Sequence, residues 1–397
     1  MRLAFIGGFA FSPKGTIRSR AHPLAAELVR RGHEVTIFLP PYDNTADAGH
    51  EWIRDGVRIT NVGISDSVVT YPGALAALIR SVNRYSPDLI HVFKPKGFSG
   101  AAATYFLAKN RSQVVLDCDD LEGWGGWNEV KSYPWILKEY IDRQERWMTR
   151  STPVITVASR SLQERANQIR GRKSGVFYVP NCVAGTATDE HLRNKVRTLS
   201  KSEVRRQFNF PDKPTVLYAG HFENGEPVHA ICQTAARVAE RNDAIVLFVG
   251  DGPELSTIRN YFSDNRQVET YFLPRLPYSD FLRVVWASDV AVYPYHDDGL
   301  HRSKCSARII DYMIMGKPVI TSAVGQNREY IVNGESGILV PPGDDDAFAG
   351  ELDRLLRDRD LCARIGQHAA LRIRDSFSWD GEALRQCLAA YEQAKAS

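Results

Sequence analysis

Short apolar runs alternate with amphipathic stretches along the whole chain. In the first half, apolar runs of strand length occupy residues 3–7, 34–39, 88–93, 113–116, 153–158 and 175–179. Stretches with helical spacing lie between them, at residues 22–31, 72–85, 101–109, 134–149 and 161–170. Residues 52–60 predict a hairpin around Asp55-Gly56. Strands that alternate with helices in this way predict a mainly parallel sheet.

The second half repeats the plan. Strands are predicted at residues 215–219, 244–249, 268–272, 290–293 and 318–321. Helices are predicted at residues 228–241, 254–262, 278–287, 307–316, 346–355, 361–374 and 379–394. Residues 184–213 are polar, and we expect a linker there with one short helix near residues 202–208. The pattern predicts an α/β protein with two Rossmann-like, doubly wound domains that face a central cleft, with ligands at the carboxyl ends of the strands.

Composition and charge narrow the class of protein. The 397 residues are 43% apolar, and no run approaches the ~18–20 apolar residues of a membrane span. The first residues lack the pattern of a signal peptide. The six cysteines are scattered without a CxxC pair, which predicts a reduced, cytoplasmic protein without structural zinc. Residues 1–185 carry 24 Lys and Arg against 17 Asp and Glu, so this half is basic and compatible with an anionic partner or membrane surface.

A polar loop and a short helix between two strands, residues 289–344, are the main candidate for a ligand site. Four apolar residues of the helix at 307–316 share one face, namely Ile309, Ile310, Met313 and Ile314. Asp311 lies on the other side. A helix N-terminus offers backbone N–H groups to an anion, and an acid turned away from the core can bind hydroxyl groups. The stretch therefore predicts a site for phosphates and a ribose.

Two glycine turns are weaker candidates. Gly7-Gly8 ends the first strand but does not extend to GxGxxG, so a nicotinamide-binding fingerprint is missing there. Gly250-Asp-Gly-Pro253 ends another strand, and either turn is compatible with tight local structure alone. The chain has no GxSxG, HExxH or P-loop sequence.

An acidic cluster with two nearby tryptophans follows the strand at residues 113–116. Asp117, Asp119 and Asp120 could share protons or bind a divalent metal, or they could cap a helix and pair with arginines. Trp124 and Trp127 stand among glycines just beyond, where an exposed ring would suit the C–H face of a sugar. Burial in the core is the alternative for both rings.

Six segments, in order along essentially the whole chain, resemble the retaining GT-B glycosyltransferases of family 4. They are Gly32-His-Glu-Val35, Pro180-Asn181, Gly250-Asp-Gly-Pro253, residues 304–320, residues 333–344 and Ser378-Trp379. The resemblance implies an acceptor-binding domain at residues 1–183, a linker at 184–213 and a nucleotide-sugar-binding domain at 214–378. A final helix at residues 379–397 would cross back to the first domain.

For the donor, the resemblance implies a nucleoside-diphosphate sugar bound mainly by the second domain. Asp311 would bind the ribose, Arg275 would lie near the nucleobase, and Lys304 would act as a catalytic residue by neutralising the diphosphate together with Arg308. The other donor-binding residues would be Gly8, His221, Gly250, Ser303, Cys305, Ser306 and Ala307.

The chain departs from the family pattern at two places. An acid is usual seven residues before the ribose-binding acid, but that position is Ser303, and Asp297 and Asp298 are out of register. The lysine that usually follows the first strand of the second domain is absent from the run that begins Gly220-His221. Lys304 and Arg308 could supply the positive charge instead.

For the acceptor, the resemblance places Asp119 at the catalytic position, with Lys94, Lys96, Asp120 and Trp124 around the acceptor. Retaining transfer on this fold relies on positioning and on charge stabilisation of the leaving diphosphate, so neither a cofactor nor a metal is expected. The acceptor would be a hydroxyl of a small molecule or a lipid-linked sugar, with peripheral membrane contact through the basic first domain. No nucleic-acid partner is expected. A nucleotide-sugar epimerase and a non-catalytic sugar- or nucleotide-binding protein are the alternatives.

Overall fold

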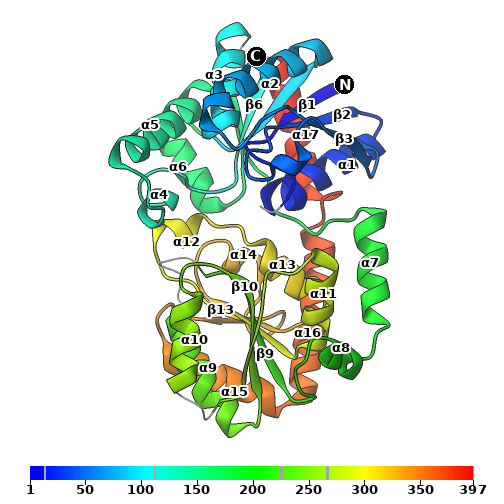
Figure 1. Ribbon diagram of the computed structural model, residues 1–397, viewed down its shortest axis with the longest axis vertical. Helices are drawn as coiled ribbons and strands as arrows, with labels where there is room; N and C mark the ends of the chain where they lie inside the picture. Colours follow the sequence, from blue (N-terminus) through cyan, green and yellow to red (C-terminus); the bar gives the residue numbers. More distant parts are fainter. Residues whose placement is uncertain (13–14, 111–112, 223–227, 265–267, 397) are drawn as a thin grey trace. The chain divides into compact units, whose positions relative to one another are not determined.

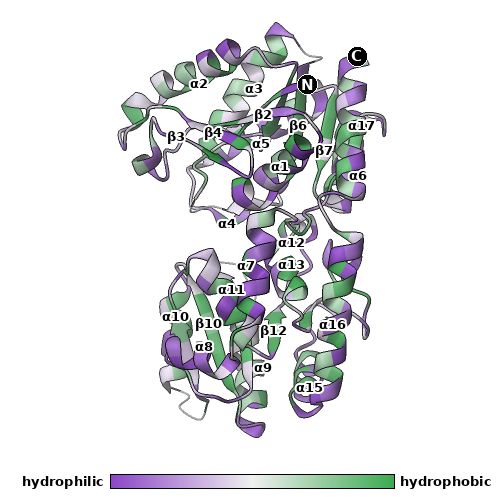
Figure 2. Cartoon of the chain, turned by 90° about the vertical axis from the view of Figure 1, so that its right-hand side faces the viewer, coloured by the Kyte–Doolittle hydropathy of each residue, from purple (hydrophilic) through white to green (hydrophobic). Residues whose placement is uncertain are grey.

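The computed structural model describes residues 1–12, 15–110, 113–222, 228–264 and 268–396. The chain forms two compact units (Figure 1). The first unit contains Met1–Thr188, Ser303–Cys305 and Ser378–Ser397, and the second contains Asp189–Arg302 and Ser306–Phe377. In both units the central strands are mainly hydrophobic, whereas the helices carry both hydrophobic and hydrophilic residues (Figure 2).

The first unit is built on an eight-stranded sheet with the order β3-β4-β2-β1-β5-β6-β7-β8. Neighbouring strands are parallel except for the pair β3 and β4. Asp55 and Gly56 join that pair with positive φ angles of 47° and 79°, which confirms the predicted hairpin. The strands are β1 Arg2–Ile6, β2 Glu34–Leu39, β3 Glu51–Arg54, β4 Val57–Asn61, β5 Leu89–Phe93, β6 Val114–Cys118, β7 Val154–Val157 and β8 Val176–Tyr178.

Helices cover this sheet. One apolar core joins the strands to α2, α3, α5 and α6 through side chains such as Leu78, Phe106, Met148 and Leu162. From the C-terminal end of the chain, α17 also packs against strands β6, β7 and β8. The helices of the unit are η1 Ile17–Ala21, α1 His22–Arg30, η2 Thr45–Asp47, η3 Val68–Thr70, α2 Tyr71–Tyr85, α3 Gly97–Lys109, α4 Trp127–Val130, α5 Trp135–Ser151, α6 Arg160–Arg170 and α17 Glu382–Ala396.

The second unit has a six-stranded sheet, all parallel, with the order β11-β10-β9-β12-β13-β14. The strands are β9 Thr215–His221, β10 Ile245–Asp251, β11 Thr270–Leu273, β12 Val290–Tyr293, β13 Val319–Ser322 and β14 Ile338–Val340. The helices are α7 Ala187–Arg197, α8 Lys201–Gln207, α9 Val228–Arg241, α10 Leu255–Asp264, α11 Tyr278–Ala287, α12 Gly299–Ser303, α13 Ala307–Ile314, α14 Asn327–Tyr330, α15 Asp345–Arg357 and α16 Arg359–Ser376. The predicted class of two parallel α/β domains is therefore confirmed.

The short helix predicted near residues 202–208 is confirmed as α8, but a second helix of the segment 184–213, α7, was missed. Strand β14 and the short helices α4, α12 and α14 were also not predicted. Helix α7 was missed because two of its three buried residues, Asp189 and Arg193, are charged. Its buried face therefore lacks the regular spacing of apolar residues that predicts a helix.

No helix in the described part of the chain is long and apolar enough to cross a membrane.

Candidate active site

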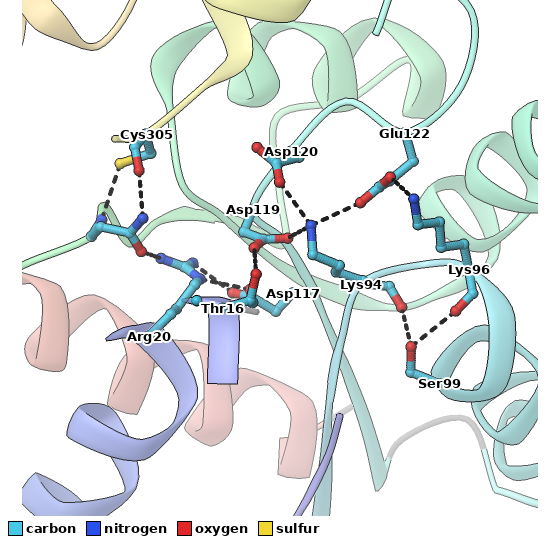
Figure 3. A network of polar contacts seen from close by, with 12 residues as sticks. Thr16, Arg20, Lys94, Lys96, Ser99, Asp117, Asp119, Asp120, Glu122 and Cys305 are labelled. Carbon is cyan, nitrogen blue, oxygen red and sulfur yellow. Dashed lines mark hydrogen bonds and ion pairs between the residues drawn. The ribbon is translucent and has the colours of Figure 1, made fainter. Parts of the chain in front are cut away.

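In the first unit, the predicted acceptor residues meet where β5 and β6 end. Lys94 follows β5 directly with a φ of 71°, an uncommon angle for a residue other than glycine. Ser99 at the start of α3 donates its hydroxyl to the carbonyls of Lys94 (2.9 Å) and Lys96 (3.0 Å), as Figure 3 shows. These two contacts fix the turn after β5, so that the Lys94 side chain points toward the acids that follow β6.

Lys94 is the centre of a buried ion network (Figure 3). Its Nζ lies 3.1 Å from Asp119, 2.7 Å from Asp120 and 2.8 Å from Glu122. Lys96 also pairs with Glu122. Burial lowers the pKa of Lys94, but the three carboxylates outweigh it and raise the pKa well above the ordinary value. The network joins three acids to two ammonium groups.

Asp119 is the acid of this network whose pKa is raised. Its Oδ2 accepts a 3.0 Å hydrogen bond from the Thr16 hydroxyl, and the residue is only 7% exposed. Burial raises its pKa to about 6, against the opposing effect of Lys94 and with the help of Asp120 and Asp117. A carboxyl group that changes protonation near neutral pH can orient or accept the proton of an acceptor hydroxyl.

Asp117 differs from its neighbours because both of its carboxylate oxygens accept hydrogen bonds from buried side chains. Arg20 donates to it through Nε (2.7 Å) and Nη2 (2.6 Å), and the Thr156 hydroxyl donates at 2.6 Å. Burial would raise the pKa of Asp117, but the Arg20 guanidinium holds it below the ordinary value. Arg20 also donates to the side chain of Asn181 at 3.1 Å. Asp117 therefore anchors this edge of the sheet.

Asp119, Asp120 and Glu122 are also the one set of possible metal ligands in the described part of the chain, with ligand atoms within 4.8 Å of one another. The Lys94 ammonium group lies within 3.1 Å of all three. A side chain therefore already supplies positive charge to these three acids.

The loop after this cluster is held by the inner face of α5. Glu145 accepts hydrogen bonds from the backbone N–H groups of Glu122 (3.1 Å) and Gly123 (2.9 Å), and Asp142 accepts one from Trp124 (3.0 Å). Burial raises the pKa of Glu145 to about 7. Glu145 and Asp142 are not predictable as site residues from the sequence, because acids on a helix rich in charges resemble surface residues.

In this loop Gly126 is required by close packing, whereas Trp124 and Trp127 make polar contacts with neighbouring side chains. A Cβ on Gly126 would lie 2.0 Å from the carbonyl oxygen of Leu121, so only glycine fits there. Trp124 is partly buried and donates its indole N–H to Glu139 at 3.2 Å. The Lys304 ammonium group lies 5.1 Å above the ring of Trp127.

The other predicted residues of the first unit are held by packing or by backbone contacts. A Cβ on Gly8 would lie 3.0 Å from the hydroxyl of Ser99, so this glycine is explained by close packing. Cys305 is buried, and its sulfur and carbonyl oxygen accept hydrogen bonds from Asn181 at 3.1 Å and 2.6 Å (Figure 3).

In the second unit, the strand ends of β9 and β10 form a tight pair of turns. The His221 ring contacts Asp251 at 2.8 Å, and both side chains are about half exposed. Gly250 has a φ of 145°, and a Cβ there would lie 1.9 Å from the carbonyl oxygen of Gly220. Glycine is therefore required for the two strand ends to approach so closely. The segment after His221 where the family's lysine is missing, residues 223–227, lies outside the described residues.

Asp311 lies on α13 beside two partners. Its carboxylate accepts a hydrogen bond from the Tyr278 hydroxyl (2.8 Å) and lies 3.5 Å from Arg308. The Arg308 guanidinium also lies 4.3 Å from the ring centre of Phe281. Asp311 is only 8% exposed, although its place on the helix predicts a side chain that points away from the core. The reason is that Tyr278, at the start of α11, covers it.

Asp297 and Asp298, the acids near Ser303, bind residues of the adjacent helix α12. Asp298 accepts from the backbone and ring of His301 at 2.8 and 2.9 Å, and Asp297 pairs with Arg302 at 2.6 Å. Ser303 is buried at the end of α12. Ser306 is the N-cap residue and Ala307 the first residue of α13. Arg275 is exposed after β11.

Two family models match the chain in succession. That of glycosyl transferase 4-like domains matches residues 15–182, and that of glycosyl transferases group 1 matches residues 200–372. A GDP-mannose-dependent alpha-(1-6)-phosphatidylinositol monomannoside mannosyltransferase from Mycolicibacterium smegmatis is 23% identical over 402 residues, covering 97% of this chain and 98% of that protein. Glycogen synthase from Mycobacterium tuberculosis is 21% identical over 381 residues, covering 92% and 81%.

Solved structures are similar over both units. Sucrose-phosphate synthase from Thermosynechococcus elongatus gives a TM-score of 0.74 at 22% identity and covers 100% of both chains. Alr3699/HepE from Anabaena, solved in complex with UDP-glucose, gives a TM-score of 0.73 at 16% identity and covers 98% of this chain and 100% of that one. These similarities confirm the predicted GT-B fold.

Proposed function

Since the chain belongs to the glycosyl transferases group 1 family, we propose that it transfers a sugar from a nucleoside-diphosphate sugar to a hydroxyl acceptor and retains the anomeric configuration. The observation that carries the proposal is the group Asp311, Arg308 and Tyr278 on α13 and α11. It combines an acid for hydroxyl groups with a cation for phosphate on elements of one domain. Related proteins support a nucleotide ligand, since HepE binds UDP-glucose and starch synthase IV from Arabidopsis thaliana binds ADP.

On the donor side, Asp311 accepts hydrogen bonds from the ribose hydroxyls. Arg308 and Lys304 neutralise the diphosphate, together with the N–H groups of the segment from Ser303 to Ala307. The turn at Gly250 and the side chain of His221 border the diphosphate and sugar, and Arg275 borders the nucleobase. Tyr278 fixes the orientation of Asp311 before the donor binds, because its hydroxyl already holds one carboxylate oxygen.

On the acceptor side, the ion network around Lys94 orients the reacting hydroxyl. Asp119 binds the acceptor hydroxyl, while Lys94 and Lys96 hold Asp120 and Glu122 in place. Trp124 offers part of its ring to the acceptor. With a pKa near 6, Asp119 is largely ionised at neutral pH and accepts a hydrogen bond from the hydroxyl.

The transfer itself needs no protein nucleophile. The bond between the sugar and the diphosphate breaks, and its electron pair goes to the diphosphate oxygen. The acceptor oxygen bonds to the same face of the sugar carbon, and its proton passes to the departing phosphate oxygen. Lys304 and Arg308 stabilise the charge that develops on the diphosphate, which is the main contribution asked of the protein. No metal ion takes part in these steps.

A panel of nucleotide sugars tests this function. Thermal shift identifies the donor, because a ligand that binds only the folded state raises Tm. Transfer to an acceptor panel with that donor, followed by NMR of the product, then reports the anomeric configuration. Inversion would contradict retention, isomerisation of the free sugar would indicate an epimerase, and binding without turnover would indicate a binding protein.

A further inference from the structure

The outer face of α5 carries an unusual concentration of exposed apolar side chains. Six large apolar residues between positions 133 and 147 are at least 36% exposed: Tyr133 36%, Trp135 67%, Ile136 77%, Leu137 40%, Tyr140 53% and Trp147 46%. The remaining exposed large apolar residues of the described chain are spread over other elements. A contiguous patch of this kind indicates a binding surface, whereas single exposed residues do not.

Helical geometry makes the patch continuous. Ile136, Tyr140, Arg143 and Trp147 are spaced i, i+4, i+7 and i+11, so they form one stripe along the outside of α5. Trp135, the first residue of α5, lies beside Ile136 at the start of the stripe, and Tyr133 precedes the helix. We call the four apolar residues Trp135, Ile136, Tyr140 and Trp147 the outer stripe.

The opposite face of α5 is already fully used inside its own unit. Ile141 and Met148 are buried, with Met148 in the core under the sheet. Asp142 and Glu145 hold the loop from Glu122 to Trp124. The outer stripe therefore contributes nothing to this packing, and its exposure to water is unfavourable by about 25 cal/mol per Å² of apolar surface.

The chemistry of the outer stripe favours a lipid surface. Trp and Tyr rings with one polar edge are enriched where membranes meet water. Arg143 lies within the stripe, and Arg146 and Arg150 follow on the same helix; Arg143 pairs with Glu139 and Arg146 with Asp142. The half of the chain that contains the stripe has an excess of seven positive charges, 24 against 17. Such charges are attracted to anionic head groups. The stripe is also a convex helix face, which suits shallow insertion into a bilayer interface.

We propose that the outer stripe of α5 docks the protein onto the surface of an anionic phospholipid bilayer. Trp135, Ile136, Tyr140 and Trp147 enter the interface between head groups and acyl chains. The arginines of α5 contact the phosphates. This binding is independent of the transfer reaction, so it can be measured without donor or acceptor.

Co-sedimentation with vesicles tests the proposal. The variant W135S/I136S/Y140S is compared with the wild type on phosphatidylcholine vesicles with and without phosphatidylglycerol. A matched control is V68S/V69S, which removes two side chains that are 68% and 83% exposed on η3 of the same unit. Wild type and control should bind the anionic vesicles, and the triple variant should bind at least about tenfold more weakly. High salt should weaken the wild-type binding.

A second measurement does not depend on the folding of the triple variant. Brominated lipids quench tryptophan fluorescence at the depth where they carry bromine, so anionic vesicles containing them should quench the wild type strongly. The variant W135F/W147F, which keeps the apolar character of both positions, should lose most of that quenching. Absence of vesicle binding by the wild type, or unchanged binding by a folded triple variant, would overturn the proposal. So would self-association of the wild type that the triple variant abolishes, because it would assign the stripe to a protein contact.

Discussion

At the scale of single residues, burial and charge together decide how the Lys94 network responds to pH. Three acids share two ammonium groups, so one negative charge is left over in a buried place. Burial, helped by the neighbouring Asp120 and Asp117, raises the pKa of Asp119 to about 6. Lys94 and Lys96 instead lower the pKa of Glu122 to about 2, although this residue is also buried. Asp119 and Glu122, which both pair with Lys94, therefore have widely separated pKa values.

This imbalance gives a prediction for Asp119→Asn. The raised pKa means that ionising Asp119 destabilises the folded state, so stability falls as pH rises from about 3.8 to about 6. Replacing the carboxylate by an amide should remove that effect. The variant should be more stable than the wild type at pH 7.5, by on the order of 1 kcal/mol, and the difference should vanish toward pH 4. Thermal unfolding across this pH range measures it.

The same variant should have lower activity. Transfer should fall about 10²-fold, since the ionised carboxylate no longer accepts a hydrogen bond from the acceptor hydroxyl. The wild-type rate should rise with pH through about 6, and the variant should lack that limb. Donor affinity serves as the control and should not change. A variant that retains both the full rate and the limb would remove Asp119 from the acceptor site.

Asp311→Ala is the matching prediction for the donor site. The loss of a charge-assisted hydrogen bond to the ribose should weaken donor binding by about 1.5–3 kcal/mol, measured by calorimetry. Tyr278→Phe keeps the carboxylate but removes its 2.8 Å hydrogen bond, so it should weaken binding less. If Asp311→Ala binds the donor as tightly as the wild type, the ribose is held elsewhere.

At the scale of elements, α5 links the acceptor loop to the body of the first unit. Glu145 and Asp142 accept three backbone N–H groups from residues 122–124, where the chain would otherwise leave buried donors unpaired. The loop can turn so sharply only because Gly126 lacks a Cβ. The geometry of this loop therefore depends on one helix and one glycine.

Gly126→Ala should disturb this loop selectively. Its Cβ would lie 2.0 Å from the Leu121 carbonyl, so the backbone must move. The KM for the acceptor should rise by about tenfold or more while the Kd for the donor stays unchanged. Gly73→Ala in α2 is the control, since its Cβ would meet nothing within 4 Å and alanine favours a helix. Equal acceptor KM values for the two variants would show that the loop does not contact the acceptor.

Sequence patterns predicted most elements but not all of the site. Apolar runs such as β5 and β6 can be recognised in the sequence because every residue in them is buried. Lys94 and Asp119 follow the ends of these two strands, where ligand-binding residues are expected. Tyr278 and Arg20 were missed, because a single polar residue on a helix has no period that marks its partner. Strand β14 has only three residues, too few for an alternation to be recognised.

At the scale of the whole molecule, the chain keeps two separate sheets, each with its own core. The candidate residues divide between them, with the Lys94 network on the first unit and Asp311, Arg308 and Gly250 on the second. Two independent cores predict that a ligand held by one unit will stabilise that unit first. The assignment of donor and acceptor to different units is therefore testable without measuring transfer.

Hydrogen exchange with and without the donor makes that test. A nucleoside diphosphate at about 100 times its Kd stabilises the state that binds it by about 2.7 kcal/mol. Amides in α13 and in the turn at Gly250 should then exchange up to about a hundredfold more slowly where they open through unfolding of the second unit. Amides of β6 and of the loop at Glu122–Trp124 should exchange as before. Protection confined to the first unit would reverse the assignment, since binding free energy appears first in the unit that holds the ligand.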